Sequence, residues 1–87
     1  MKGRARIALN LRRIRVAKGI SQEGLAFDAE VDRSYISGIE RESFNPTIDM
    51  LEKLAAALAI DVSEFLVIPR GAAAQPKPLK PGRRPNR

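Results

Sequence analysis

The stretch from Ile20 to Thr47 reads ISQEGLAFDAEVDRSYISGIERESFNPT, and it decides the fold. Its pattern predicts two short helices joined by a tight turn. Ser21 is a suitable N-cap for the first of these helices, because its hydroxyl can accept a backbone N–H of the first turn. Leu25 and Ala26 then supply the inward face of about two helical turns.

The second helix of this stretch divides its side chains between two faces. Asp32 is the expected cap, and Ile36, Ile39 and the carbon stem of Glu40 fall together at i, i+3 and i+4. The opposite face collects Ser34, Ser37, Gly38 and Arg41, with Arg33 and Tyr35 flanking it in the first turn. Small residues allow close approach to base edges, and Arg and hydroxyl groups offer hydrogen bonds to them. We interpret this face as suited to the major groove of DNA.

Three ordered strings lie within about Ile7 to Leu66: IRVAKGISQEGLA, VDRSYISGIER and NPTIDMLEKLAAAL. On these strings the chain resembles the Cro/CI-type (Xre) helix-turn-helix regulators of bacteria and phages. DRSYISGIER is most similar to the controller proteins of restriction-modification systems. The resemblance implies an all-α, five-helix, lambda-repressor-like DNA-binding domain. It also implies a dimer that binds double-stranded DNA at an inverted repeat, with half-sites about 34 Å apart and the third helix in the major groove.

Residues at the start of the third helix contact bases in the resembled family. The expected base contacts here are Arg33, Ser34, Ser37 and Gly38. An Arg at this place can bind guanine through two hydrogen bonds, whereas Gly38 would permit close approach. Two other roles stay open for Arg33, which are contact with phosphate alone and pairing with Asp32 or Glu30.

Other positions of the motif match phosphate contacts. The expected set is Gln22, Tyr35, Arg41 and Asn45. Gln22 begins a helix, where free N–H groups and the positive end of the helix dipole favour an anion. The alternative for Gln22 is a solvated residue of the first turn. For Tyr35 the alternative is packing against the flank of the helix.

Two further positions bear on the geometry of the motif. Arg15 and Glu40 align with a family pair that joins the first and third helices by a partly buried salt bridge, which gives Glu40 a structural role. Glu30 stands where the family usually has Gly in the turn. Because Glu is poorly suited to positive φ, either the turn differs or a cost of about 1 kcal/mol is absorbed.

The remaining apolar residues predict the other helices. The first helix should run from about Arg4 to Lys18, and a fifth should follow Asp61, which has capping-box spacing to Glu64. Pro46 should lie just before or inside the fourth helix, with Asn45 or Thr47 as its cap. The expected core residues are Ile7, Leu11 and Ile14 of the first helix, Ile48, Leu51, Leu54, Ala55 and Leu58 of the fourth, and Phe65 and Leu66.

Charge is distributed unevenly along the chain. Residues 1–18 carry seven basic and no acidic side chains, residues 19–68 carry three basic and ten acidic, and residues 69–87 carry six basic and no acidic. We therefore expect a nearly neutral helix-turn-helix domain over 1–68 and a basic, Pro-rich, disordered tail over 69–87. Such a tail is either an arm that adds phosphate contacts or a solubilising segment.

Composition narrows the class of function. The chain has no Cys and no His, so most nucleophile and general-base arrangements are missing, and we expect neither an enzyme nor a metal or cofactor site. No apolar run has the length of a membrane span or a signal peptide, which predicts a cytoplasmic protein. No small-molecule ligand is evident. The alternative function is an antitoxin or a protein-interaction module built on the same fold.

Dimerisation is expected to use the end of the domain. A single recognition helix reads only a few base pairs, so a second copy is needed for a longer site. The candidate interface residues are Phe65, Val67 and Ile68, and the sequence does not separate core from interface among them.

Overall fold

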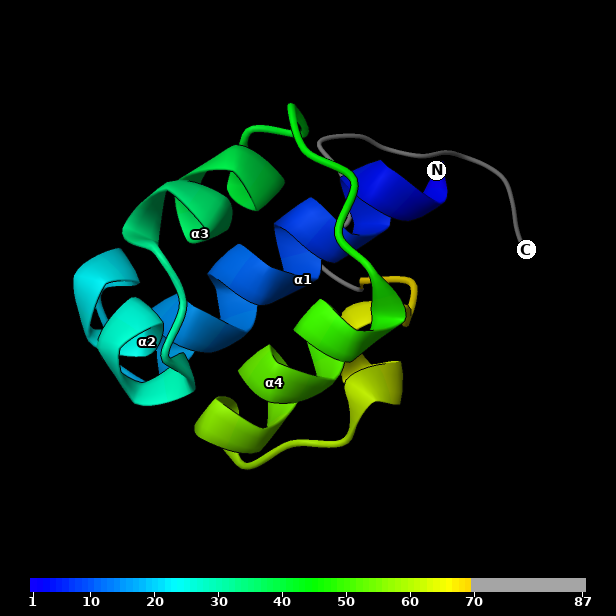
Figure 1. The fold of residues 1–87 in the computed structure, drawn as a ribbon. Helices are drawn as coiled ribbons and strands as arrows, with labels where there is room; N and C mark the ends of the chain where they lie inside the picture. Colours follow the sequence, from blue (N-terminus) through cyan, green and yellow to red (C-terminus); the bar gives the residue numbers. More distant parts are fainter. Residues whose placement is uncertain (70–87) are drawn as a thin grey trace.

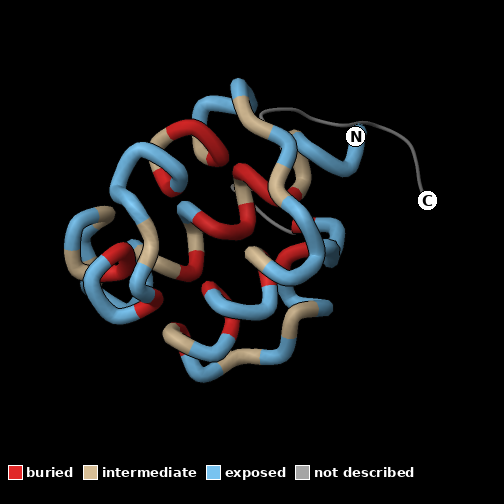
Figure 2. Tube along the Cα trace, viewed as in Figure 1, coloured by how far each residue is buried: buried red, intermediate tan, exposed pale blue. Residues whose placement is uncertain are grey.

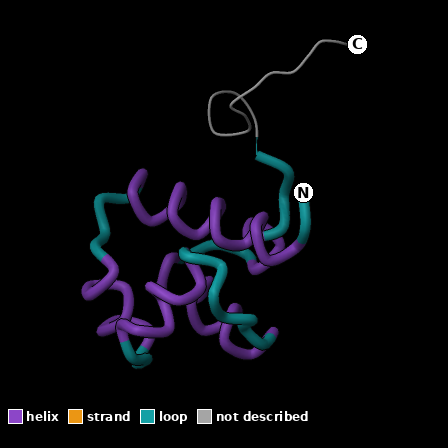
Figure 3. Tube along the Cα trace, turned by 90° about the horizontal axis from the view of Figure 1, so that it is seen from above, coloured by secondary structure: helices purple, strands orange, loops and turns teal. Residues whose placement is uncertain are grey.

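The computed structural model describes residues 1–69. These residues form four α-helices, α1 (Gly3–Ala17), α2 (Gln22–Ala29), α3 (Arg33–Glu40) and α4 (Ile48–Leu58), followed by a 3₁₀ turn, η1 (Val62–Phe65) (Figure 1). Helices and loops make up the whole of the described part (Figure 3). The all-α class is confirmed, but the expected fifth helix is a single 3₁₀ turn. The predictions for the tail, apart from Pro69, lie outside the described residues.

Three of the four α-helices, α2, α3 and α4, begin where the sequence places polar caps. Three side-chain caps accept backbone N–H groups: Ser21 from Gly24 (2.9 Å), Asp32 from Ser34 (3.5 Å) and Thr47 from Met50 (3.1 Å). Thr47, not Asn45, therefore caps α4, and Pro46 precedes the helix. Each cap satisfies one of the backbone donors that a helix start leaves free.

The turn between α2 and α3 keeps left-handed geometry despite its glutamate. Glu30 has φ 58° and ψ 45°, and its N–H donates to the Phe27 carbonyl (3.2 Å). The next N–H, of Val31, donates to the carbonyl of Ala26 (3.0 Å). Of the two outcomes that the sequence left open, the strain is absorbed and the turn is retained. Ala59 closes α4 in the same conformation, at φ 59°.

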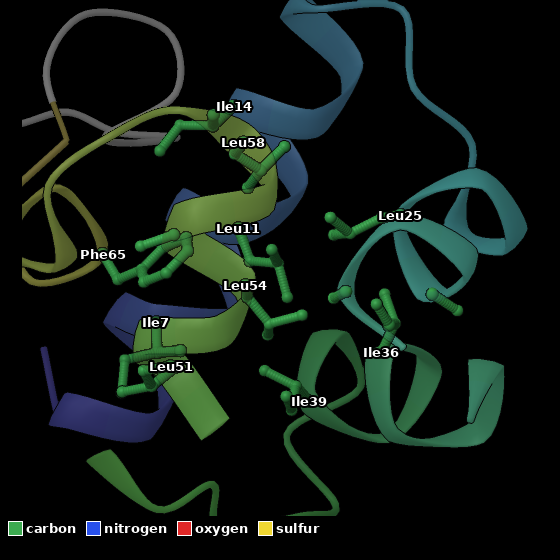
Figure 4. Packing of buried hydrophobic residues seen from close by; sticks show 13 residues of the cluster. Ile7, Leu11, Ile14, Leu25, Ile36, Ile39, Leu51, Leu54, Leu58 and Phe65 are labelled. Carbon is green, nitrogen blue, oxygen red and sulfur yellow. The ribbon is translucent and has the colours of Figure 1, made fainter. Parts of the chain in front are cut away.

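One hydrophobic core joins all five elements (Figures 2 and 4). Leu11, Leu25, Ile36 and Leu54 have no solvent exposure, and Phe65 closes the core from η1. Two expected core residues are exposed instead: Ile48, at 60%, and Leu66, at 41%. Ile48 is the first residue of α4 and precedes the turn that reaches the core, and Leu66 follows the end of η1, so neither prediction was right.

The C-terminal end of the described chain is fastened to α1 by a buried polar residue. Asn10 is fully buried, and its amide nitrogen donates to the carbonyls of Phe65 (2.9 Å) and Val67 (2.7 Å). Arg13 donates to the amide oxygen of Asn10 (3.2 Å), and Arg6 donates to the carbonyl of Leu66 (3.1 Å). Because the segment has no helix of its own, these bonds fix its course along α1.

The described helices are short. None of those in residues 1–69 has both the length and the apolar character that crossing a membrane requires.

Candidate nucleic-acid interface

The two helices of the predicted motif pack against each other and against the rest of the core. Figure 1 shows α2 and α3 at one end of the molecule and η1 at the other, with α1 and α4 between them. Leu25 from α2 and Ile36 from α3 are both fully buried at this junction, and Figure 4 shows both among the core side chains that also include Leu11 and Leu54. The angle between the helices is thereby fixed by core packing as well as by the turn at Glu30.

An ion pair ties α3 to α1 beneath this motif. Arg15 Nε donates to Glu40 Oε2 (2.8 Å), and Arg15 Nη2 donates to Glu40 Oε1 (3.0 Å). The Arg15 side chain is 12% exposed and the Glu40 side chain 4%. The remaining terminal nitrogen of Arg15 donates to the carbonyl of Ile20 (2.9 Å), just before α2. The hydrogen bond that Arg15 donates to Glu40, together with the negative charge of Glu40, raises the pKa of Arg15 despite the opposing effect of burial, so the guanidinium stays charged.

Gln22 extends this pair to the surface. Its amide nitrogen donates to Glu40 Oε1 (3.1 Å), and its amide oxygen accepts from Nη1 of Arg33 (3.4 Å). The first residues of α2 and α3 are therefore joined by their side chains. Arg33 forms neither of the pairings that the sequence left open, with Asp32 or with Glu30, because the one salt bridge found within residues 1–69 is that of Arg15 and Glu40. It contacts Gln22 instead.

The open face of α3 carries polar side chains along its length. Arg33 and Ser34 are exposed in the first turn, and Ser37 is half-buried one turn later. Arg41 follows the last turn, where its guanidinium donates to the hydroxyl of Ser37 and to that of Ser43 (3.4 Å). The face thus offers one arginine at each end with hydroxyl groups between them.

Gly38 lies elsewhere than the sequence predicts. It is buried under the loop that follows α3, and a Cβ at this position would lie 3.2 Å from the Cβ of Phe44. The carbonyl of Gly38 also accepts from the backbone N–H (2.9 Å) and the hydroxyl (3.2 Å) of Ser43. Gly38 therefore allows the loop to approach the helix, and it is not part of the open face.

Tyr35 packs against the same loop. Its ring meets that of Phe44 edge to face, with centroids 4.8 Å apart and an interplanar angle of 64°. The ring remains 38% exposed, so packing occupies one side of Tyr35 and leaves the other open. Asn45, three residues beyond Glu42, is exposed and borders a surface recess with Lys2 and Arg4 at the start of α1.

The sequence analysis missed two residues beside this interface, Ser43 and Phe44, and one away from it, Asn10. Ser43 and Phe44 hold the loop after α3, and a run between Arg41 and Pro46 gave no periodic signal for either. Asn10 did leave a signal, because it falls on the apolar stripe of α1 at i+3 from Ile7, where a polar residue is unusual. In residues 1–69 no cluster of three acidic, His or Cys side chains could hold a metal ion.

Family comparison agrees with this arrangement. Residues 11–65, more than half of the chain, match the model of the helix-turn-helix family HTH_3. The chain belongs to this family. The resemblance to Cro/CI-type regulators is thereby confirmed, including the likeness to controller proteins.

Two similar proteins illustrate the relationship. A Neisseria meningitidis protein named as a hypothetical transcription factor is 43% identical over 67 residues, covering 77% of this chain and 63% of the relative. The control protein C.BamHI of Bacillus amyloliquefaciens is 42% identical over 57 residues, covering 64% of this chain and 70% of the relative. The chain thus spans somewhat under two thirds of the first relative and somewhat more of the second.

Solved structures share the same fold. The Neisseria transcription factor NHTF superposes with a TM-score of 0.73 at 42% identity, covering 76% of each chain. The restriction-modification controller protein C.Esp1396I, solved as a tetramer in complex with its natural 35 base-pair operator, superposes with a TM-score of 0.69 at 38% identity, covering 75% of this chain and 86% of that one.

Proposed function

We propose that the chain is a sequence-specific DNA-binding transcriptional regulator that binds an inverted-repeat operator as a dimer, with α3 in the major groove. The observation that carries this proposal is the joining of Gln22 and Arg33, which brings the exposed starts of α2 and α3 to one place. Helix starts present unpaired N–H groups, and an arginine beside them can reach base edges. The similar controller protein C.Esp1396I was solved as a tetramer with its operator DNA, which supports operator binding by a chain of this fold.

Each side chain of the interface has a role in this proposal. Arg33 reads guanine through two hydrogen bonds, and Ser34 with Ser37 contacts neighbouring base edges. Gln22 donates its second amide N–H to a backbone phosphate at the start of α2.

The phosphate contacts continue along α3 and the loop after it. Arg41 and Asn45 contact the DNA backbone, and the open side of Tyr35 lies against sugar and phosphate. Gly38 contributes through packing of the loop, so it makes no direct contact.

Local charge placement matters because the domain has no overall excess of positive charge. Residues 1–68 carry ten basic and ten acidic side chains. The first turn of α3 has no acidic residue, whereas α2 has Glu23 in its first turn. Attraction to phosphate therefore depends on the few arginines near the interface, and we expect a moderate dependence of affinity on salt.

The proposed dimer surface lies at the η1 end of the molecule. Leu66, Val67 and Ile68 are exposed in succession, at 41%, 39% and 69%, whereas Phe65 is fully buried and belongs to the core. An apolar run of this kind on a small domain is suited to meeting a second copy. Ile68→Asp should shift the sedimentation coefficient to that of a monomer, and Ile48→Asp, at an exposed Ile of α4, should leave it unchanged. Equal behaviour of the two variants would place the interface elsewhere.

Selection of bound sequences from random duplex DNA tests the proposed function. We expect recovery of an inverted repeat, followed by loss of binding to it in Arg33→Ala/Ser34→Ala by mobility shift. Arg12→Ala, at an exposed arginine of α1, is the matched control for charge. Recovery of no repeat would contradict sequence-specific binding, and so would an unchanged affinity of the double variant. A protein-interaction module would give that outcome.

A further inference from the structure

We infer that the exposed face of α2, formed by Glu23, Phe27 and Glu30, binds the basic, Pro-rich segment of residues 70–87 of the same chain. The inference concerns the free protein, so it goes beyond the proposed function and does not depend on it. It assigns a partner to a helix face that no other element of residues 1–69 covers. Docking there brings positive charge to a domain in which basic and acidic side chains are equal in number.

The apolar part of this face is the ring of Phe27. It is 83% exposed, more than any other large hydrophobic side chain of residues 1–69. The buried side chains of α2 are Leu25, Ala26 and Ala29, so the helix packs on the core through its other side. Figure 1 shows α2 at the edge of the molecule. A phenylalanine ring is a large apolar surface, and leaving it in water forgoes the stabilisation that burial gives.

The charges around Phe27 all have the same sign. Glu23 lies one helical turn before it and Glu30 about one turn after it, so both are its neighbours on the surface. Asp28 is adjacent in sequence and exposed. Residues 19–32 carry four acidic side chains and no basic one. Within residues 1–69 none of these carboxylates belongs to a salt bridge. The face therefore suits a partner that combines positive charge with an apolar group.

Residues 70–87 have this complementary chemistry. They carry six basic and no acidic side chains, and the prolines from Pro76 to Pro85 are interspersed with Lys and Arg. Pro-rich segments dock on aromatic side chains, and carboxylates beside the aromatic ring attract the cationic groups between the prolines. Proline also restricts φ, so less conformational freedom is lost when such a segment binds.

The segment is long enough to reach α2. It begins after Pro69, which follows η1, and Figure 1 shows η1 and α2 at opposite ends of the molecule. A compact domain of this size is about 28 Å across, so a path over its surface from end to end is about 44 Å. An extended Pro-rich chain advances about 3.1 Å per residue, which places Lys80 to Arg84 about 34–47 Å from Pro69 along the chain. Tethering gives an effective concentration on the order of mM, so a weak contact is populated.

Other acidic places on the domain suit the segment less well. The exposed side of α4 has Asp49 and Glu52, but Lys53 follows them and α4 contains no aromatic residue. In η1 the carboxylate of Asp61 already accepts the backbone N–H of Ser63 (2.9 Å). The pair on α4 is thus a control surface with two carboxylates and no ring.

Paramagnetic broadening in the full chain tests the inference. The chain has no Cys, so Asn86→Cys supplies a single attachment site for a nitroxide. We expect a loss of amide signal intensity at residues 23–30 of the DNA-free protein. Intensity should return in about 1 M NaCl, where the screening length is about 3 Å. Phe27→Ser should reduce the loss, because it removes the apolar contact.

Two variants with the same change of charge separate docking on α2 from general attraction. Glu23→Lys/Glu30→Lys should abolish the loss of intensity at residues 23–30, because the face would then repel the segment. Asp49→Lys/Glu52→Lys, on the exposed side of α4, should retain it. The dispersion of the amide spectrum verifies that each variant is folded.

Three results would overturn the inference. One is equal broadening in the two charge variants, and another is the absence of broadening at residues 23–30 without any charge substitution, as expected if the face binds only a separate basic protein. The third is broadening that arises only between chains, in a mixture of ¹⁵N-labelled protein without Cys and spin-labelled protein without ¹⁵N. Each measurement is made without DNA, so its failure is distinguishable from failure of the operator selection.

Discussion

Replacement of Arg15 by Met should be among the most destabilising single changes in this chain. The substitution keeps the aliphatic stem but leaves the carboxylate of Glu40, which is 4% exposed, without its charged partner. It also removes the bond to the carbonyl of Ile20. Loss of one partner of a buried pair costs about 3–5 kcal/mol. A domain of this size has a free energy of unfolding of about 4–10 kcal/mol, so the variant should be partly unfolded at room temperature or close to it.

Thermal and urea unfolding followed by circular dichroism measure this effect. For a domain of this size, each kcal/mol lowers the melting temperature by about 4–8 °C, so a decrease of at least about 12 °C is expected. Arg12→Met is the matched control, because Arg12 lies on the same helix and is exposed. Its free energy of unfolding should stay within about 0.5 kcal/mol of the wild type.

The double variant Arg15→Met/Glu40→Met tests the physical cause. If the cost comes from a stranded charge, removing Glu40 as well should recover most of the stability, because apolar residues of similar volume replace buried pairs at little cost. A double variant less stable than Arg15→Met would refute the reasoning. The same conclusion would follow if Arg15→Met and Arg12→Met lost equal stability.

Three further predictions concern the turn at Glu30, the buried hydrogen bonds of Asn10 and the pH dependence of stability. Glu30→Gly should raise the free energy of unfolding by about 0.5–1 kcal/mol in urea, because φ 58° suits glycine, whereas Glu23→Gly, inside α2, should lower it by about 1 kcal/mol. Asn10→Leu leaves two backbone carbonyls unpaired, so unfolding in urea should show a loss of about 1–3 kcal/mol, and sedimentation should show a weaker dimer. Hydrogen bonds from the hydroxyl and from the backbone N–H of Ser63 lower the pKa of Asp61. The contribution of ionised Asp61 to the free energy of unfolding is therefore complete above the unfolded carboxyl pKa of about 3.9, and it is lost as pH falls through the folded pKa. Asp61→Asn should therefore flatten the decrease in stability below about pH 4, and a titration of melting temperature with an unchanged slope would contradict this.

The local order of the fold was predictable because short-range rules determine it. A polar side chain that directly precedes an apolar helical pattern predicts an N-cap, and Ser21, Asp32 and Thr47 cap their helices in this way. Helix periodicity likewise identified Leu11, Ile36 and Leu54 as core. These features depend on residues within about four positions of one another, so a single sequence contains the information.

Features that depend on tertiary packing were not predictable in the same way. Helical periodicity placed Gly38 on the open face of α3. In the structure the loop at Phe44 covers Gly38, and the conformation of a loop leaves no periodic signal in the sequence. Ile48 fits the helical stripe by spacing and is exposed because it is the first residue of α4, and the helix meets the core from Met50 and Leu51 onward.

The candidate site likewise has a part that the local sequence predicts and a part that depends on tertiary packing. The sequence indicated that Arg33 and Gln22 belong to the interface, each on its own helix. Their mutual contact, and that of Gln22 with Glu40, depends on the separation and angle of three helices. Such distances follow from the packed core, which no local pattern encodes.

Asn10 has a consequence for how operators of this kind change over time. It fastens the exposed segment before Pro69 to α1, and Figure 1 shows η1, which leads into this segment, at the opposite end of the molecule from α2 and α3. The surface where we propose that two copies meet and the surface that we propose reads bases therefore lie at opposite ends of the domain. They are connected through α1 and share no side chain. If the proposed dimer and base contacts hold, substitutions in the segment would alter the spacing of half-sites, and substitutions at the start of α3 would alter the base sequence that each half-site requires. Spacing and sequence of a binding site can thus diverge in separate mutational steps.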